Sequence, residues 1–135
     1  MVSSVPVELK LLVAAVIVGI VQIVWAAAAG GGGDRNFAYL SGPRDEARPV
    51  GTVAGRLDRA LKNFLETFPL FAAALLACVA VGKVGGTLTV YGAGLYVLAR
   101  VLYVPLYAAG TPMVRTLVWT AAMVGIFMVI VAFFG

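Results

Sequence analysis

The sequence predicts an all-α protein, an integral membrane four-helix bundle, and three observations support this fold class. Hydrophobic residues make up 62% of the chain and charged residues only 12%, at a mean hydropathy of +1.03, whereas soluble domains carry about 25% charged residues. A chain of 135 residues is also too small to bury so much apolar surface away from water. The apolar stretches are continuous and show no alternation of the barrel type. Residues 1–135 are therefore predicted to form a single four-span membrane domain.

Each of four segments is long and apolar enough to cross the hydrocarbon core as a helix. The predicted spans are residues 9–29, 55–82, 87–109 and 112–134. A cleaved signal peptide is the alternative for the first span, because "AAAAG" places small residues after an apolar run, but Glu8 and Lys10 make a poor start for one. Before the fourth span, Thr111 is expected as the N-cap and Pro112 as the first helical residue.

Positive charge divides the two ends of the predicted bundle. Only Lys10 and Lys83 fall at the end that carries both termini. The other cations gather at the opposite end, at positions Arg35, Arg44, Arg48, Arg56, Arg59, Lys62, Arg100 and Arg115. The positive-inside rule places this cationic end in the cytoplasm, together with the loop 30–54. Both termini are then expected on the non-cytoplasmic side.

A ridge of polar side chains runs into the second span, in the stretch "GRLDRALKNFLETFPLF". At about 100° per residue, its members fall within roughly 80° of one another on one helix face. They are Arg56, Arg59, Asn63 and Glu66. Asp58 and Lys62 lie four residues apart on a neighbouring face and are interpreted as ordinary surface ions.

The third predicted span repeats this arrangement in "YVLARVLYVPLY". One stripe, within roughly 60° on the same spacing, holds an arginine and three tyrosines. They are Tyr96, Arg100, Tyr103 and Tyr107. An interfacial aromatic belt, with Arg100 extending to the headgroups, is the alternative, but a belt would surround the helix rather than follow one face. An ionisable residue inside a span usually faces a partner or a cavity.

Arg115 lies in the first turn of the fourth span, where the helix dipole already disfavours a cation. The polar end of the bundle therefore holds Arg56, Arg59, Arg100 and Arg115 against one ridge carboxylate, Glu66. This imbalance indicates a site for a small anionic ligand, with a purely structural network as the alternative.

Several other classes of site receive little support. The chain has one cysteine and no histidine, which excludes a disulfide framework, and no metal site is predicted. Cys78 lies among Ala, Leu and Val, as is typical of inert packing cysteines. The net charge of +4 comes without a basic run, so a nucleic-acid partner is not expected. Gly92, Gly94 and residues 72–74 are interpreted as sites of close helix contact.

Two stretches resemble the MAPEG family, the membrane-associated proteins of eicosanoid and glutathione metabolism. These are "RALKNFLETFPLF" and "ARVLYVPLYAAGTPMVRTLVW", and the resemblance runs from Gly55 to the C-terminus. The family's Arg–Asn–Glu–Pro spacing matches Arg59, Asn63, Glu66 and Pro69, with a Glu-to-Pro step closer to the leukotriene synthase branch than to the transferases. "GPRDE" is similar to bacterial members, which implies a bacterial inner membrane.

The resemblance implies a homotrimer of four-helix subunits, with the co-substrate glutathione bound in a bent form at each subunit interface. Arg59, Asn63 and Glu66 would hold the glutathione backbone, and Glu66 would take its amino group. Arg100, Tyr103 and Tyr107 would hold carboxylates and wall the site. Arg115 would face the thiol. The family's helix-one arginine has no counterpart within the first predicted span, and Arg35 in the following loop is the candidate. Pro105 removes a backbone donor from the third helix.

An independent estimate favours Arg115 over a tyrosine for the thiol. A free thiol has a pKa near 8.5, and lowering it by two units takes about 2.7 kcal/mol. One guanidinium at about 4 Å in an effective dielectric near 20 offers about 4 kcal/mol, whereas a neutral hydroxyl offers about 1 kcal/mol. The sequence thus predicts a glutathione-dependent transferase or peroxidase that attacks lipophilic electrophiles from the bilayer. The alternatives are a non-enzymatic lipid-binding or lipid-presenting protein and, more weakly, a passage for anions along a trimer axis.

Overall fold

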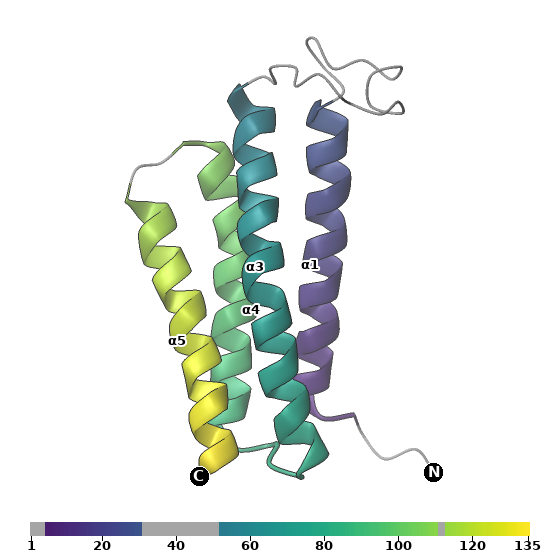
Figure 1. Cartoon of the computed structure of the whole chain (residues 1–135), viewed down its shortest axis with the longest axis vertical. Helices are drawn as coiled ribbons and strands as arrows, with labels where there is room; N and C mark the ends of the chain where they lie inside the picture. Colours follow the sequence, from purple (N-terminus) through teal and green to yellow (C-terminus); the bar gives the residue numbers. More distant parts are fainter. Residues whose placement is uncertain (1–4, 31–51, 111–112) are drawn as a thin grey trace.

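A computed structural model describes residues 5–30, 52–110 and 113–135, and within them the all-α fold is confirmed. Four helices follow one another along the chain: α1 (Val7–Gly30), α3 (Thr52–Ala80), α4 (Thr87–Ala108) and α5 (Val114–Phe134). Each contains a stretch apolar and long enough to cross a membrane. The helices stand side by side and alternate in direction, so α1 begins and α5 ends at the same end of the bundle (Figure 1).

The helix boundaries differ from the predicted spans at several ends. The predicted loop 30–54 is shortened at both edges, because α1 continues to Gly30 and α3 begins at Thr52. The predicted cap at Thr111 and Pro112 lies outside the described residues. α5 begins at Val114, and the residue before it, Met113, has a positive φ of 68°. Arg35, Arg44 and Arg48 also lie outside the described residues.

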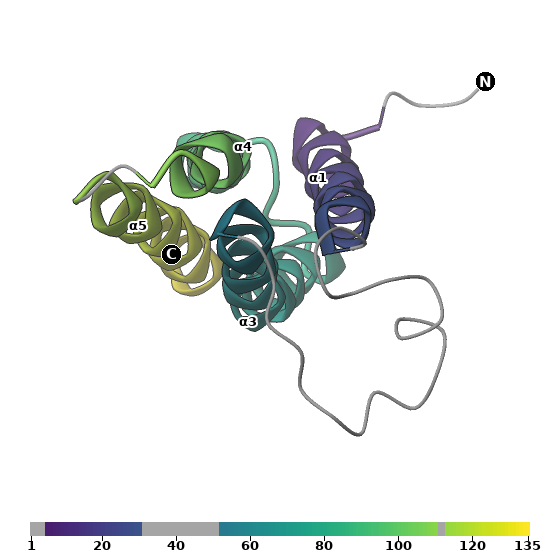
Figure 2. The ribbon, with the colours of Figure 1, turned by 90° about the horizontal axis from the view of Figure 1, so that it is seen from above.

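The four helices do not contribute equally to the bundle. Seen along the axis, α3 lies between α1 and α5, with α4 beside all three (Figure 2). Over the part of the chain that the structure describes, α1 packs on α3 and α4 but makes no contact with α5. The helix pair α4 and α5 packs most closely, because two glycines face each other there. A Cβ on Gly125 would lie 2.6 Å from the carbonyl oxygen of Gly92, which confirms Gly92 as a site of close helix contact.

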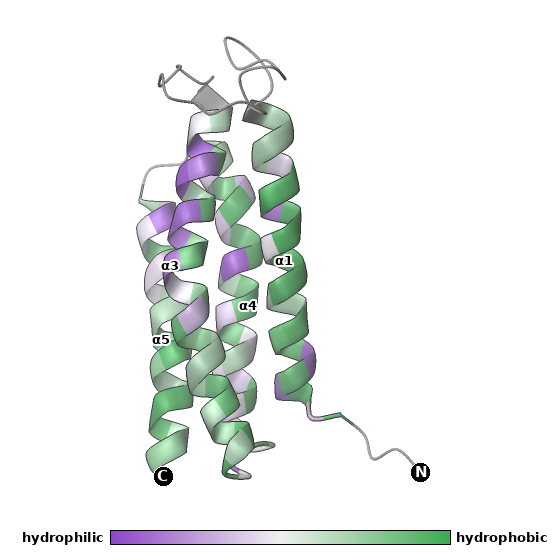
Figure 3. Ribbon diagram, turned by 45° about the vertical axis from the view of Figure 1, so that its right-hand side comes forward, coloured by the Kyte–Doolittle hydropathy of each residue, from purple (hydrophilic) through white to green (hydrophobic). Residues whose placement is uncertain are grey.

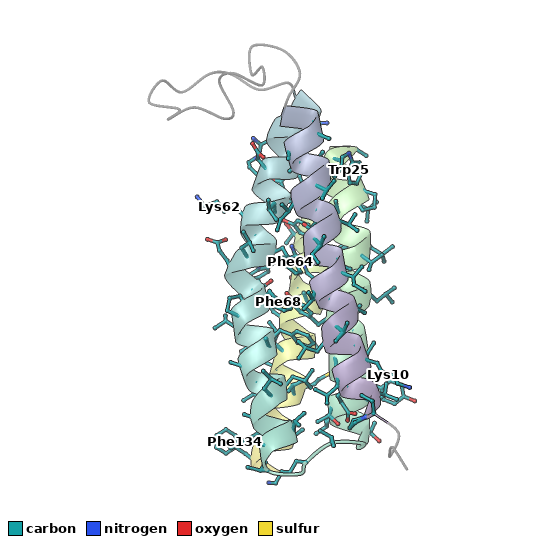
Figure 4. All side chains as sticks on the ribbon, turned by 90° about the vertical axis from the view of Figure 1, so that its right-hand side faces the viewer. Lys10, Trp25, Lys62, Phe64, Phe68 and Phe134 are labelled. Atoms are coloured by element: carbon teal, nitrogen blue, oxygen red, sulfur yellow. The ribbon has the colours of Figure 1, made fainter. Side chains whose placement is uncertain are left out.

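Aromatic side chains fill the space between the helices. Phe71 and Tyr96 stack with ring centroids 4.1 Å apart, and the Tyr96 hydroxyl shares a 2.9 Å hydrogen bond with Thr67. Phe64 and Phe68 lie on the side of α3 that faces α1 (Figure 4), with ring centroids 5.2 Å apart. Cys78 is fully buried in the same core, as its apolar surroundings predicted.

The end of the bundle that carries the start of α1 is closed by a buried carboxylate. Glu8 is fully buried, and its Oε2 accepts hydrogen bonds from the backbone N–H of Gly85 and, at 2.6 Å, from the Thr89 hydroxyl. At the same end, Lys83 Nζ donates to the carbonyl of Phe133 at 2.8 Å. These contacts join α1 and the C-terminus of α5 to the α3–α4 turn.

Candidate functional site

Polar residues gather toward the opposite end of the bundle, where α3, α4 and α5 meet. Figure 3 shows hydrophilic positions concentrated on the upper half of α3 and on its neighbours there. A pocket of about 440 Å³ opens among these three helices. Its lining residues are Arg59, Lys62, Asn63, Glu66, Tyr103, Tyr107, Arg115, Thr116 and Trp119. Small-molecule sites typically occupy about 300–1,000 Å³, so this pocket has room for a small ligand.

The ridge on α3 supplies one wall of the pocket. Arg59, Asn63 and Glu66 all line it, as the helical spacing predicted, and they come from consecutive turns of α3. Glu66 is exposed at the rim and, of the residues the structure describes, is the only acidic one that lines the pocket. Over the described residues, Glu66 forms no ion pair, so its carboxylate is available to a ligand amine.

The tyrosine stripe on α4 divides between the pocket and the core. Tyr103 and Tyr107 are buried and line the pocket. Tyr96, about two turns before Tyr103, belongs to the core and is absent from the described lining of the pocket. Tyr91 is 66% exposed, on the other side of α4. The stripe is therefore an inward-facing row and does not form an aromatic belt.

Tyr107 joins the arginines of two helices. Its hydroxyl oxygen accepts a hydrogen bond from Arg59 Nε and another from Arg115 Nη1, each at 3.2 Å. The two guanidinium carbons also lie 5.9 Å and 5.5 Å from the centroid of the same ring. Because one neutral phenol orients both cations, α3 and α5 present two positive charges to the same space.

Arg100 occupies a different place from the one the resemblance implied. Its side chain is fully buried and is absent from the lining of the pocket. Arg100 Nη1 donates to Asn63 Oδ1 at 2.7 Å, and Nη2 donates to the carbonyl of Ala60 at 3.4 Å. Its guanidinium carbon lies 4.3 Å from the centroid of the Tyr103 ring. In this chain Arg100 supports two pocket residues from behind and does not present its guanidinium to the pocket.

A second pocket of about 360 Å³ adjoins the first at the end of the bundle. Arg56, Arg59 and Arg115 line it together with Tyr107, and none of its described lining residues is acidic. Arg56 Nη1 donates to the carbonyl of Ala108 at 3.3 Å. The guanidinium also lies against Gly110, where an added Cβ would come within 2.6 Å of Arg56 Cζ. Because Gly110 has no side chain, the Arg56 guanidinium can occupy the space beside it.

Sequence reasoning missed three of the residues that line the larger pocket. Lys62 was interpreted as a surface ion, and it projects outward from α3 at the rim (Figure 4). Thr116 and Trp119 follow Arg115 on α5. Trp119 lies four residues after Arg115, so helical spacing alone places it on the same face. The position of Trp119, one turn after a candidate site arginine, could therefore have indicated that it lines the pocket.

The fold and the pocket together define an all-α integral membrane protein with a cationic, amide- and carboxylate-lined pocket near one end of its bundle. The chain belongs to the MAPEG family, whose family model matches residues 10–135, nearly the whole chain. This membership places it among the membrane proteins of glutathione and eicosanoid metabolism. Comparison with curated proteins and with solved structures gave no match.

Proposed function

We propose that this protein is a membrane-embedded glutathione-dependent transferase or peroxidase that stabilises a thiolate for attack on lipophilic electrophiles. The observation that carries the proposal is the convergence of Arg59 and Arg115, from separate helices, on the Tyr107 hydroxyl inside a pocket that has one carboxylate. Family membership supports the choice of glutathione as the co-substrate.

The charges of the pocket fit this tripeptide. Glutathione carries two carboxylates, one ammonium and a thiol, with two amide groups between them. Arg59 offers a guanidinium to a carboxylate, exposed Glu66 offers a carboxylate to the ammonium, and Asn63 offers an amide to the peptide backbone. The remaining guanidinium of the pocket, that of Arg115, is then free to interact with the glutathione sulfur. Two guanidiniums, the Lys62 ammonium and one carboxylate give the described lining the net positive charge that a net anionic ligand requires.

The proposed chemistry assigns the thiolate to Arg115. Its guanidinium favours the ionised sulfur, which is the nucleophile, over the protonated thiol. In conjugation, the sulfur forms a bond to an electrophilic carbon. At the same time the bond from that carbon to its leaving group, or to the epoxide oxygen, breaks. The apolar helix surfaces beside the pocket let a lipophilic electrophile arrive from the bilayer.

A homotrimer with glutathione at each subunit interface is part of the proposal. Arg59, Glu66 and Arg115 are exposed on the single subunit, where water would screen their charges. A neighbouring subunit over the pocket would exclude that water and strengthen each interaction. We further propose that the polar end faces the cytoplasm of a bacterial inner membrane, with both termini on the other side, because the cations gather at this end.

Titration of glutathione into protein in lipid nanodiscs, followed by the ultraviolet absorbance of the thiolate, tests the proposal. The wild type is expected to bind glutathione saturably with a rise in thiolate absorbance. Arg115→Ala is expected to bind the tripeptide without that rise. Lys10→Ala, an exposed cation at the far end, is the matched control and should behave as the wild type.

Two outcomes contradict the proposal. Absence of saturable glutathione binding by the wild type would overturn it, and binding of a fatty acid under the same conditions would favour a non-enzymatic lipid-binding or lipid-presenting protein. Full thiolate absorbance in Arg115→Ala would remove the assigned role of this arginine.

A further inference from the structure

Arg100 is a buried cation whose hydrogen bonding is incomplete. It is fully buried, with two of its three nitrogens engaged by Asn63 and by the carbonyl of Ala60. The third nitrogen, Nε, has no hydrogen-bond partner among the described residues. A buried charged donor without a partner is costly, so the protein is expected to satisfy it.

A second incomplete group lies on α1. Gln22 is only 2% exposed, in a span that is otherwise almost entirely apolar. Neither Oε1 nor Nε2 of its amide has a hydrogen-bond partner among the described residues. An amide offers one acceptor and two donors, so Gln22 can supply the acceptor that Arg100 Nε–H lacks.

The packing of the helices places these two side chains at the same height in the bundle. α1 and α4 run in the same direction (Figure 1), and Ala26 of α1 packs in one buried cluster with Val104 of α4. Gln22 lies one turn before Ala26, and Arg100 lies one turn before Val104. Gly19 identifies the face of α1 that points into the bundle, because a Cβ added to it would lie 2.8 Å from Cε2 of Phe64.

Phe64 gives an independent position for the same layer. The Arg100 guanidinium carbon lies 5.5 Å from the centroid of the Phe64 ring, and that ring contacts α1 at Gly19. Gln22 follows Gly19 by three residues, on the same face of α1. The unpartnered amide and the unpartnered Nε therefore lie in one buried layer between α1, α3 and α4.

We propose that Gln22 is a positioning residue, which holds Arg100, through one shared internal water, in the orientation that orders Asn63 in the pocket. Buried waters usually make two to four hydrogen bonds to polar groups, and Gln22 Oε1, Gln22 Nε2 and Arg100 Nε supply three. The water oxygen accepts from Arg100 Nε–H, and the water donates to Gln22 Oε1. The helix-one contribution to the site is then an amide that acts from within the bundle.

Asn63 transmits the effect to the ligand. Its Oδ1 accepts from Arg100 Nη1 at 2.7 Å, and this bond leaves Nδ2 as the end of the amide that can donate to a pocket ligand. A rotated Arg100 would release the amide to flip and to present an acceptor to an anion instead. This step rests on the proposed function, whereas the link between Gln22 and Arg100 does not.

Nuclear magnetic resonance of isotope-labelled protein in detergent tests that link without any ligand. The Nε–H signal of Arg100 is assigned by its loss in Arg100→Lys. Gln22→Met, a replacement of similar length with no polar atom, is expected to move the Hε resonance upfield because the hydrogen bond is lost. Gln22→Glu retains an acceptor and should keep the signal downfield. Val21→Met, which introduces the same side chain at the neighbouring exposed residue, is the control. An unmoved signal in Gln22→Met would overturn the proposal.

A double-mutant cycle on glutathione affinity tests the link through Asn63. Gln22→Met is expected to weaken binding about fivefold, the effect of losing one hydrogen bond, and to have no effect in an Asn63→Ala background. Thermal stability should fall, because the buried Arg100 Nε–H is left without a hydrogen-bond partner. Equal loss in both backgrounds would overturn the role of Asn63. If the wild type binds no glutathione, the proposed function fails, and the resonance experiment still decides the role of Gln22.

Discussion

The two ends of the bundle each contain one fully buried charged residue, and the two are treated differently. At the end that holds the termini, Glu8 Oε2 accepts hydrogen bonds from the Gly85 N–H and the Thr89 hydroxyl. Gly85 lies just before the N-cap of α4 and Thr89 lies in its first turn, where the helix dipole is positive. At the other end, Arg100 lies among aromatic rings and neutral oxygens, with no carboxylate near it in the described chain.

This difference separates a structural end from a functional one. Oε2 of the Glu8 carboxylate is bound by groups of the chain itself, which fastens α1 to the rest of the bundle, while Oε1 has no hydrogen-bond partner among the described residues. A pocket of about 380 Å³ at the Glu8 end has a single charged lining residue among those described, Lys83. The Arg100 end has two adjoining pockets, with exposed Arg59, Glu66 and Arg115 around them. Positive charge there exceeds what the described acids neutralise, as expected where a ligand supplies the remaining negative charge.

Arg115→Ala is the change with the largest expected effect, and it acts on chemistry rather than on folding. Loss of about 2.7 kcal/mol of thiolate stabilisation raises the thiol pKa from about 6.5 to about 8.5, which lowers the thiolate fraction, and hence the conjugation rate, about 25-fold at neutral pH. The deficit should shrink as the pH rises past about 8.5, because the thiol then ionises without assistance. Initial rates with a model electrophile, measured every few tenths of a pH unit between about pH 6 and pH 9, test this pH dependence.

The melting temperature of Arg115→Ala should match that of the wild type, since the residue is exposed. A deficit that is constant across the pH range would contradict the thiolate role. It would instead indicate that Arg115 serves only to bind substrate.

Glu8→Ala should show the opposite pattern. It removes a charged acceptor from two donors and detaches the first turn of α1, so the free energy of unfolding should fall by about 2 kcal/mol. Glutathione affinity should stay unchanged because Glu8 lies at the far end of the bundle. Denaturation in detergent and a parallel titration measure the two effects, with Lys10→Ala as the control. Unchanged stability would contradict the fastening role of Glu8.

Arg100→Met sharpens the comparison between the two buried charges. Replacing a buried charge by an apolar side chain of similar volume is often neutral for stability, so unfolding should change by less than about 1 kcal/mol. Glutathione affinity should nevertheless fall about tenfold, since Asn63 loses its charged hydrogen-bond donor. The same two measurements apply here. A large loss of stability with unchanged affinity would make Arg100 a structural residue like Glu8.

The fold was largely predictable because its cause is visible along the chain. Continuous apolar stretches predict four spans, and helical spacing alone brought Arg59, Asn63 and Glu66 to one face. These inferences need only distances within a single helix, which a sequence contains directly. Thus the wall of the pocket on α3 could be derived without any knowledge of how the helices pack.

What depends on contacts between helices was not predictable. Glu8 had no visible partner, because Gly85 and Thr89 approach it only after α1 packs on the α3–α4 turn. Arg100 was expected in the pocket, since its stripe is correct, but helix rotation places it behind Asn63. Gln22 is a single amide in an apolar run, and only its height relative to α4 indicates a role.

Gly110→Ala is expected to give the smallest effect and tests how firmly the functional end is built. Gly110 has a φ of +72°, which disfavours any other residue by about 1 kcal/mol. The new Cβ would also displace the guanidinium of Arg56, which can move because it ends a long side chain. The melting temperature should therefore fall slightly, with a loss of affinity confined to anions that use the second pocket. Gly94→Ala is the control, because Gly94 lies inside α4 and an added Cβ would meet no described atom within 4 Å beyond the backbone of its own helix. The stability of this variant should rise by about 0.5–1 kcal/mol. If Gly110→Ala behaves like Gly94→Ala, the Gly110 turn does not hold Arg56, and the end with Glu8 is the only rigidly fastened one.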